Sequence, residues 1–147
     1  MRYTILIALV CFVFLGCKKD TYSTTPQLTF KSLNTKELQP DQVIKINLSF
    51  TDAEGDVVNK LYIQKVSLNC PNSIFTDSVA IPDFPTSKNL KGDILVSYAN
   101  GANVPPYINI AFGCNVNDTT YFKFVLKDKA NHTSDTARSD IFVIVKQ

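Results

Sequence analysis

A chain of 147 residues has room for one domain with a short extension. Its formal net charge of +2, with lysines and arginines scattered along the sequence, argues against nucleic acid as a partner. The chain contains one histidine and no tryptophan. Because histidine is the commonest acid–base group of enzymes, this composition favours a protein that is not an enzyme.

The N-terminal segment has the organisation of an export signal. Arg2 precedes an apolar run over Tyr3–Leu15, which is shorter than the roughly 20 residues of a membrane-spanning helix. The small residue Gly16 and then Cys17 follow. We therefore expect residues 1–16 to be a cleaved signal peptide. An ordinary signal peptide before an incidental cysteine and an uncleaved membrane anchor are the alternatives.

The segment Phe14-Leu15-Gly16-Cys17 resembles the lipobox of bacterial lipoproteins. The resemblance implies that a peptidase cuts before Cys17 and that this cysteine carries the acyl chains that hold the protein on a membrane. The start Cys-Lys-Lys-Asp resembles lipoproteins of the Bacteroidetes group. An aspartate directly after the cysteine, which retains some lipoproteins in the inner membrane, is absent. The implied location is the bacterial cell envelope, at the outer membrane.

A polar stretch separates Cys17 from the body of the chain. Lys18–Gln27 is rich in serine and threonine, contains Pro26 and has no apolar period. Residues 17–27 are therefore interpreted as the lipidated cysteine and a flexible tether. The folded domain is expected to span residues 28–147.

The body of the chain has a hydrophobic period of two. In Val43–Phe50, four apolar residues at alternate positions are expected to face inward, which is the pattern of a half-buried strand. Within Leu61–Leu68 the apolar positions change phase, which predicts a bulge or a bend. Ile141–Val145 is a continuous apolar run, typical of a strand covered on both faces or at a pairing edge. The same analysis predicts further strands over residues 28–33, 74–79, 94–98, 108–112 and 121–127.

About seven to eight short strands with turn signals between them, and no helical period, predict an all-β fold. The favoured architecture is an antiparallel β-sandwich of the immunoglobulin-like (Ig-like) or fibronectin III-like kind, and a small barrel is the alternative. Ile81–Leu90, with two prolines, is expected to be a surface loop or a connection between sheets. The loops Asp52–Asp56 and Asp128–Asn131 resemble loops of bacterial Ig-like domains, which supports this fold.

The remaining cysteines of the expected mature chain form an even pair. With Cys17 acylated, Cys70 and Cys114 would lie in an oxidising compartment, so a disulfide between them is predicted. Two unpaired thiols are the alternative. A catalytic thiol would need a base, and the single histidine, His132, lies in a polar loop and is expected at the surface.

An acidic loop follows the strand that ends near Phe50. Asp52, Glu54 and Asp56 surround Gly55, and the simpler interpretation is a solvated hairpin turn in which Gly55 has a positive φ and an aspartate accepts backbone N–H groups. The alternative is a calcium site that Asp128 and Asn131 complete, if they lie at the same end of the sandwich. No other cofactor is expected.

These features lead to two functional hypotheses. The first is a non-catalytic, membrane-anchored module that contacts proteins or glycans of the envelope. Its candidate surface aromatics are Tyr98, Tyr107 and Tyr121. The second is a periplasmic carrier that holds a small ligand in an internal apolar pocket. No nucleic-acid partner is expected, and the sequence gives no indication of an oligomeric state.

Overall fold

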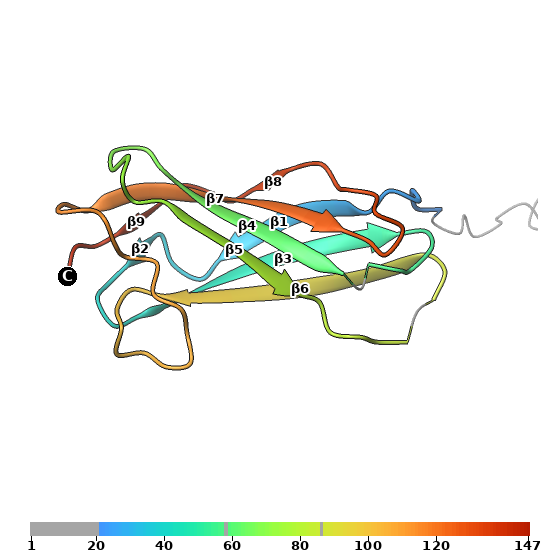
Figure 1. The fold of residues 1–147 in the computed structure, drawn as a ribbon, viewed down its shortest axis with the longest axis horizontal. Helices are drawn as coiled ribbons and strands as arrows, with labels where there is room; N and C mark the ends of the chain where they lie inside the picture. Colours follow the sequence, from blue (N-terminus) through green and yellow to red (C-terminus); the bar gives the residue numbers. More distant parts are fainter. Residues whose placement is uncertain (1–20, 58, 86) are drawn as a thin grey trace, which may run out of the picture.

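Figure 1 shows the computed structural model, which describes residues 21–57, 59–85 and 87–147. These residues form strands and no helix. Accordingly, no helix within the described ranges is long and apolar enough to cross a membrane. The strands are β1 (Gln27–Leu33), β2 (Glu37–Leu38), β3 (Val43–Asp52), β4 (Lys60–Ser67), β5 (Phe75–Ala80), β6 (Leu90–Ala99), β7 (Asp118–Lys127), β8 (Ala137–Arg138) and β9 (Phe142–Ile144).

The strands form two sheets. The smaller sheet has the order β1-β3-β6, and both of its pairs are antiparallel. The larger sheet has the order β2-β9-β7-β4-β5, with β8 paired to β7. Only the short β2 runs parallel to its neighbour, β9. The prediction of an all-β protein with two packed sheets is confirmed, and the separate sheets argue against a closed barrel.

The core lies between the sheets and follows the predicted alternation. Ile44, Ile46 and Leu48 of β3 are fully buried, and so are Phe122 and Phe124 of β7. The aromatic rings pack against one another across the core. The ring of Phe122 stacks on those of Tyr98 at 5.5 Å and Phe142 at 5.7 Å between centroids. The strand predictions for these segments are confirmed.

The predicted strand over residues 108–112 is wrong. A single bridge between Ala99 and Asn109 is the only pairing in this segment of the described chain. The side chain of Asn109 accepts the amide N–H groups of Gly101 and Ala111 at 3.0 and 2.9 Å. This bonding curls the backbone locally and replaces a ladder. Of the apolar residues in the pattern, Ile110 is buried, while Ile108 is 52% exposed.

The bulge predicted in Leu61–Leu68 is also wrong. Strand β4 pairs with β5 and with β7 without any shift of register. Leu61 and Ile63 point into the core, and the next inward-facing position of the strand is Lys65, whose side chain is only 2% exposed. The apparent change of phase therefore arises from a charged residue that occupies a core position. A register shift occurs in β1 instead, between Phe30 and Ser32.

The C-terminal apolar run forms a strand that is paired on both sides. β9 lies between β2 and β7, and its side chains alternate: Phe142 and Ile144 are buried and Val143 is half-buried. Ile141 precedes the strand and is 47% exposed. The run therefore forms a strand that pairs with a neighbour on each side and buries one face in the core. It is not covered on both faces.

The described part of the predicted tether contacts the domain. The carbonyl oxygen of Ser23 accepts the amide of Ala53 at 2.9 Å. Pro26 is buried, and β1 already begins at Gln27. Ordered contacts therefore start a few residues before Leu28. The predicted signal peptide, Cys17 and the first residues of the tether lie outside the described residues.

Candidate functional site

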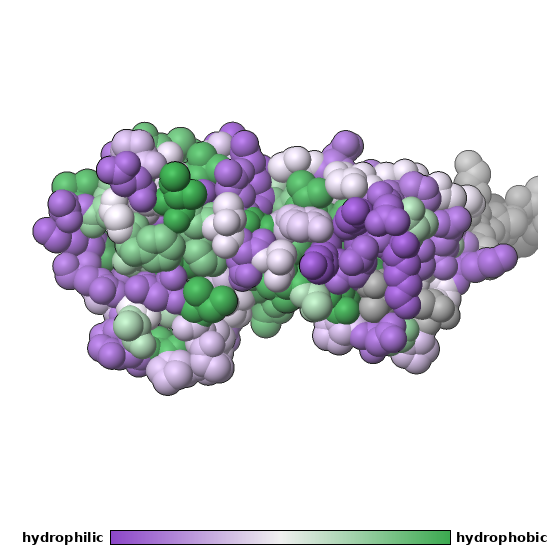
Figure 2. Space-filling model, viewed as in Figure 1, coloured by the Kyte–Doolittle hydropathy of each residue, from purple (hydrophilic) through white to green (hydrophobic). Residues whose placement is uncertain are grey.

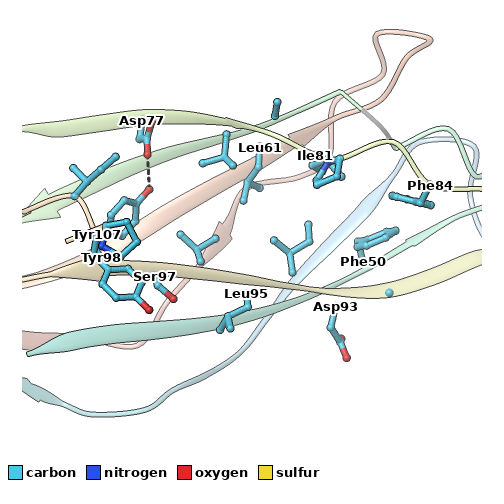
Figure 3. A pocket seen from close by; sticks show the side chains of 18 of the residues that line it. Phe50, Leu61, Asp77, Ile81, Phe84, Asp93, Leu95, Ser97, Tyr98 and Tyr107 are labelled. Atoms are coloured by element: carbon cyan, nitrogen blue, oxygen red, sulfur yellow. Dashed lines mark hydrogen bonds between the residues drawn. The ribbon is translucent and has the colours of Figure 1, made fainter. Parts of the chain in front are cut away.

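A pocket opens along the edge of the sandwich where β5 and β6 face each other. Each of these strands is the last of its sheet, so the two edges are not joined by hydrogen bonds. The pocket has a volume of about 690 Å³, which lies within the range of small-molecule sites. Figure 3 shows side chains from both sheets converging on it. Its main apolar lining residues are Phe50, Leu61, Ile81, Phe84, Ile94 and Val96.

The walls of the pocket are extensions of the hydrophobic core. Phe50 and Leu61 at its base are almost fully buried. Ile81, Phe84 and Ile94 pack against the core but are only partly buried. Their exposed apolar surface is the part that a ligand would cover, because burial of apolar area is the main favourable term in small-ligand binding.

One glycine shapes the base of the pocket. Gly92 of β6 lies beside the ring of Phe50, and a Cβ atom at this position would lie 2.8 Å from two ring carbons. That distance is shorter than a van der Waals contact, so any side chain here would push the ring into the pocket. The glycine therefore keeps both the ring position and the open volume.

The pocket has a polar end next to β5. The hydroxyl group of Tyr98 donates a hydrogen bond to Asp77 Oδ2 at 2.9 Å, as Figure 3 shows. Burial raises the pKa of the Tyr98 phenol well above its usual range, and the hydrogen bond and the charge of Asp77 raise it further. The phenol is consequently neutral and remains a hydrogen-bond donor at physiological pH.

The pocket is visible on the surface as a hollow. In Figure 2 hydrophobic atoms lie between two lobes on the lower rim of the molecule, which Figure 1 identifies with the segments around residues 81–89 and 100–112. The loop predicted over Ile81–Leu90 is confirmed as a connection between the two sheets. The sequence pattern did not predict that this loop forms a wall of the pocket. The available signal was Ile81 and Phe84, because a fully solvated loop has little reason to contain large apolar side chains.

The acidic residues of the predicted calcium site lie at one end of the sandwich. Carboxylate oxygens of Asp52, Asp56 and Asp128 come within 4.8 Å of one another. Asp52 Oδ2 accepts the amides of Gly55 and Asp56, and Gly55 has a φ of 74°. Burial raises the pKa of the Asp52 carboxyl, and Asp56 and Asp128 raise it further, while the two amides oppose this shift. The predicted bonds from backbone N–H groups to an aspartate and the positive φ of Gly55 are thus present beside the carboxylate cluster. The prediction of a solvated hairpin is wrong, because β3 and β4 belong to different sheets and both Asp52 and Gly55 are buried.

The other two residues assigned to that site lie in the adjoining loops. Glu54 is exposed and is absent from the group of approaching carboxylates. Asn131 is exposed with a φ of 72°, and its amide donates to the carbonyl of Asp128 at 3.3 Å. It takes the left-handed turn position that glycine often occupies. The geometry therefore gathers the carboxylates of three aspartates, leaves Glu54 outside and places Asn131 in the turn that begins at Asp128.

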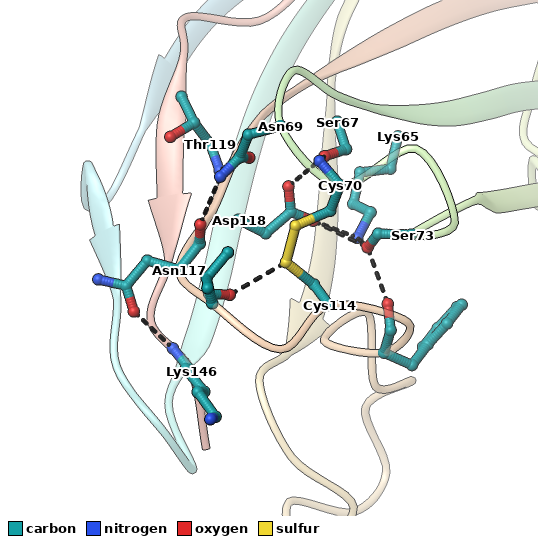
Figure 4. The surroundings of a disulfide bond; sticks show 12 residues. Lys65, Ser67, Asn69, Cys70, Ser73, Cys114, Asn117, Asp118, Thr119 and Lys146 are labelled. Carbon is teal, nitrogen blue, oxygen red and sulfur yellow. Dashed lines mark hydrogen bonds and ion pairs between the residues drawn. A yellow bond between two sulfur atoms is a disulfide. The ribbon is translucent and has the colours of Figure 1, made fainter.

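The predicted disulfide is present. Cys70 and Cys114 are bonded across 44 residues, and Figure 4 shows the bridge joining the loops before β5 and before β7. Since both sulfur atoms are consumed, this pair can act neither as a metal ligand nor as a nucleophile. The bridge fixes the two loops at the end of the sandwich where β4 terminates.

Beside the disulfide lies a buried ion pair that the sequence did not reveal. Lys65 Nζ contacts Asp118 Oδ2 at 2.9 Å and the carbonyl of Ile110 at 2.9 Å, and it also contacts Ser73. Ser67 donates to the other oxygen of Asp118. Every polar group of the cluster thus has a partner (Figure 4). The strict alternation of β4 was the available signal, because it places Lys65 inside.

The predicted aromatic patch does not form. Tyr98 is buried in the core, Tyr107 is 40% exposed at the edge of the pocket, and Tyr121 lies under the guanidinium of Arg138 at 3.8 Å. Tyr98 and Tyr107 thus both line the pocket, whereas Tyr121 lies apart from them on β7. His132 is exposed as expected, and its Nδ1 lies 3.0 Å from Asp128 Oδ2.

No protein-family model and no curated protein matches this sequence significantly. Among solved structures, the chain is similar to Spo0M, a sporulation control protein from Bacillus subtilis, with a TM-score of 0.44 and 6% identity over 84% of this chain and 50% of that one. It thus spans about half the length of Spo0M. A Niemann-Pick type C2 protein from Japanese carpenter ant has a TM-score of 0.41 and 10% identity over 88% of this chain and 98% of that one. Likenesses this distant carry no information on activity.

Proposed function

We propose that this chain is a non-catalytic lipoprotein of the bacterial cell envelope that binds a small apolar ligand between β5 and β6. Acyl chains on Cys17 hold the protein on the outer membrane, and the β-sandwich, of the Ig-like kind, carries the ligand site. The observation that supports ligand binding most is the open apolar pocket of about 690 Å³. We therefore favour binding of a small ligand in the pocket over binding of proteins or glycans through surface aromatic side chains.

Two independent features support the location. The short apolar run before Cys17 is suited to an export signal, and several acyl chains on one cysteine would give stable anchoring. The Cys70–Cys114 disulfide fits an oxidising compartment, in which such bonds form and persist. Contact with envelope proteins or glycans stays a prediction, and no nucleic-acid partner is proposed.

The lining of the pocket indicates the class of ligand. The base and walls are apolar, so the body of the ligand is a hydrocarbon chain or ring system. Of the charged lining residues, Asp77 places a negative charge at the rim, whereas the side chain of Asp93 points away from the pocket in Figure 3. A ligand with an uncharged polar end suits this rim better than an anion does, and that end can bond to the Tyr98–Asp77 pair.

The absence of tryptophan from the sequence allows a site-specific test. Phe84→Trp places the single indole of the full chain in the pocket wall. A monoacylglycerol brominated in its acyl chain is expected to quench this indole at micromolar concentration, because bromine quenches only on contact. Adding Ile94→Phe, which fills the pocket, should weaken the quenching at least about tenfold, a loss of about 1.4 kcal/mol.

Two variants serve as matched controls. Tyr62→Trp places the indole on the outer face of β4, where Tyr62 is 42% exposed, and should show only weak collisional quenching. Asn47→Phe adds a ring to the exposed outer face of β3 and should leave the affinity of the Phe84→Trp chain unchanged. Equal quenching at positions 62 and 84, or no effect of Ile94→Phe, would refute the pocket as the site.

A further inference from the structure

The acidic cluster lies at the end of the sandwich where β3 and β7 terminate. Asp52 is the last residue of β3, Asp56 lies in the following loop and Asp128 follows β7 directly. One carboxylate oxygen from each lies within 4.8 Å of the other two. Three carboxylates at this separation repel one another strongly unless a cation lies between them.

Two oxygen atoms of the cluster are buried without a partner. Asp52 is 0% exposed, and its Oδ1 atom has no hydrogen-bond partner within the described ranges. Asp56 Oδ1 is likewise buried and unpartnered among those residues. Buried carboxylate oxygens are normally satisfied, so two such atoms in one cluster indicate a missing positive ligand.

The protein's own cations do not supply that charge. Among the described residues no lysine or arginine forms a salt bridge with Asp52, Asp56 or Asp128, and Lys129, adjacent to Asp128, pairs with Asp83 at 3.4 Å. His132 contacts Asp128 Oδ2 but reaches neither of the unpartnered oxygens in the hydrogen bonds of the described chain. The two orphan oxygens are thus free to bind a metal ion.

We propose that Asp52, Asp56 and Asp128 bind a calcium ion. Ca²⁺ bonds of about 2.3–2.6 Å allow ligand oxygens to lie up to about 5 Å apart, so three carboxylate oxygens within 4.8 Å of one another can share one ion. Ca²⁺ also accepts irregular ligand geometry from loops, whereas Mg²⁺ requires a nearly ideal octahedron. The remaining ligands are backbone carbonyls or water, which reaches the ion from the half-exposed side of Asp56. With three carboxylates, we expect a Kd of about 10⁻⁴–10⁻³ M, as in extracellular calcium modules.

The ion would join two parts of the chain. It bridges the loop after β3 to the start of the loop after β7, which already share the bond from the Lys129 amide to the Asp56 carbonyl at 3.0 Å. Ala53, between two of the ligands, donates to Ser23 and accepts from the amide of Asn89 at 2.9 Å. Calcium therefore orders the end of the domain that faces the predicted tether.

The proposal is tested by thermal unfolding of the full chain in chelator and with CaCl₂ up to 10-fold above the Kd measured by calorimetry. Calcium should raise the Tm by about 5 °C. Asp52→Asn and Asp128→Asn should abolish the shift, and the Tm of Asp52→Asn in chelator should equal or exceed that of the unchanged chain, because the amide keeps the acceptor and removes the repulsion.

Glu54→Gln is the matched control, because it removes a charge from the same loop but not from the cluster; its calcium shift should match that of the unchanged chain. If an asparagine variant fails to fold by circular dichroism, calorimetric titration of Asp56→Asn, whose side chain is partly exposed, replaces it and should show no binding. Three results would overturn the proposal. They are an equal Tm in chelator and in CaCl₂, a Tm rise with MgCl₂ as large as that with CaCl₂, and the loss of the calcium-induced Tm rise in Glu54→Gln.

Discussion

Replacing Lys65 with methionine is expected to lower the free energy of unfolding by about 3–5 kcal/mol. The substitution preserves the length of the side chain but removes the ammonium group that neutralises Asp118. The Asp118 side chain is 4% exposed, so its carboxylate would stay buried with only hydroxyl groups as partners. The carbonyl of Ile110 would lose its partner as well. Urea unfolding followed by circular dichroism measures the effect.

Lys60→Met provides the control, because Lys60 belongs to the same strand but is exposed. Its effect should lie within about 0.5 kcal/mol of zero. Combining Lys65→Met with Asp118→Leu should restore part of the loss, since no unpaired charge is then buried. If Lys65→Met were no more destabilising than Lys60→Met, the buried ion pair would not contribute as described.

Removing the disulfide with Cys70→Ala and Cys114→Ala is expected to lower the free energy of unfolding by about 3–4 kcal/mol. The bond closes a loop with a sequence separation of 44 residues, and its loss would give the unfolded chain more conformations. Ser73 lies in one of these loops and Ser67 ends β4 just before it; both bond to Asp118, so native packing would loosen there as well. Urea midpoints of the two chains give the comparison.

Dithiothreitol supplies the control for this pair. The reductant should shift the midpoint of the unchanged chain toward that of the double variant and should leave the double variant unaffected. Identical midpoints for the oxidised chain and the double variant would show that the bond adds nothing to stability.

The sequence predicted most of the sandwich because its strongest strands have one apolar face. Every second residue from Ile44 to Phe50 in β3, and from Phe122 to Leu126 in β7, is apolar and buried, so the period of two was sufficient. Residues 108–112 have the same period but do not form a strand. There the side chain of Asn109 accepts hydrogen bonds from two backbone amides and so determines the conformation of the segment. The alternation of apolar and polar residues gives no information on these hydrogen bonds.

The candidate sites were less accessible to sequence reasoning. Strand alternation could identify Lys65 as inward-facing, but its partner Asp118 is distant in sequence and depends on the pairing of β4 with β7. The pocket depends on which strands end the two sheets, a property of topology that no local pattern encodes. For the acidic loop, spacing suggested Glu54, and only the geometry replaced it with an aspartate cluster.

The acidic cluster and the pocket lie in different parts of the same domain. The cluster lies at the end of β3 and β7, whereas the pocket lies along the β5 and β6 edge. Variants of Asp52 should therefore change stability more than ligand affinity. The apolar pocket remains the central element of the functional proposal, and its occupancy can be observed directly.

The most direct measurement is a methyl NMR titration of the full chain, labelled at isoleucine, leucine and valine, with a monoacylglycerol. The largest chemical-shift changes are expected at Leu61, Ile94 and Val96, which line the pocket. Leu68, Ile74 and Val116 are 54%, 66% and 56% exposed outside it and should change little. Changes confined to those exposed methyl groups, or no changes at all, would contradict ligand binding between β5 and β6.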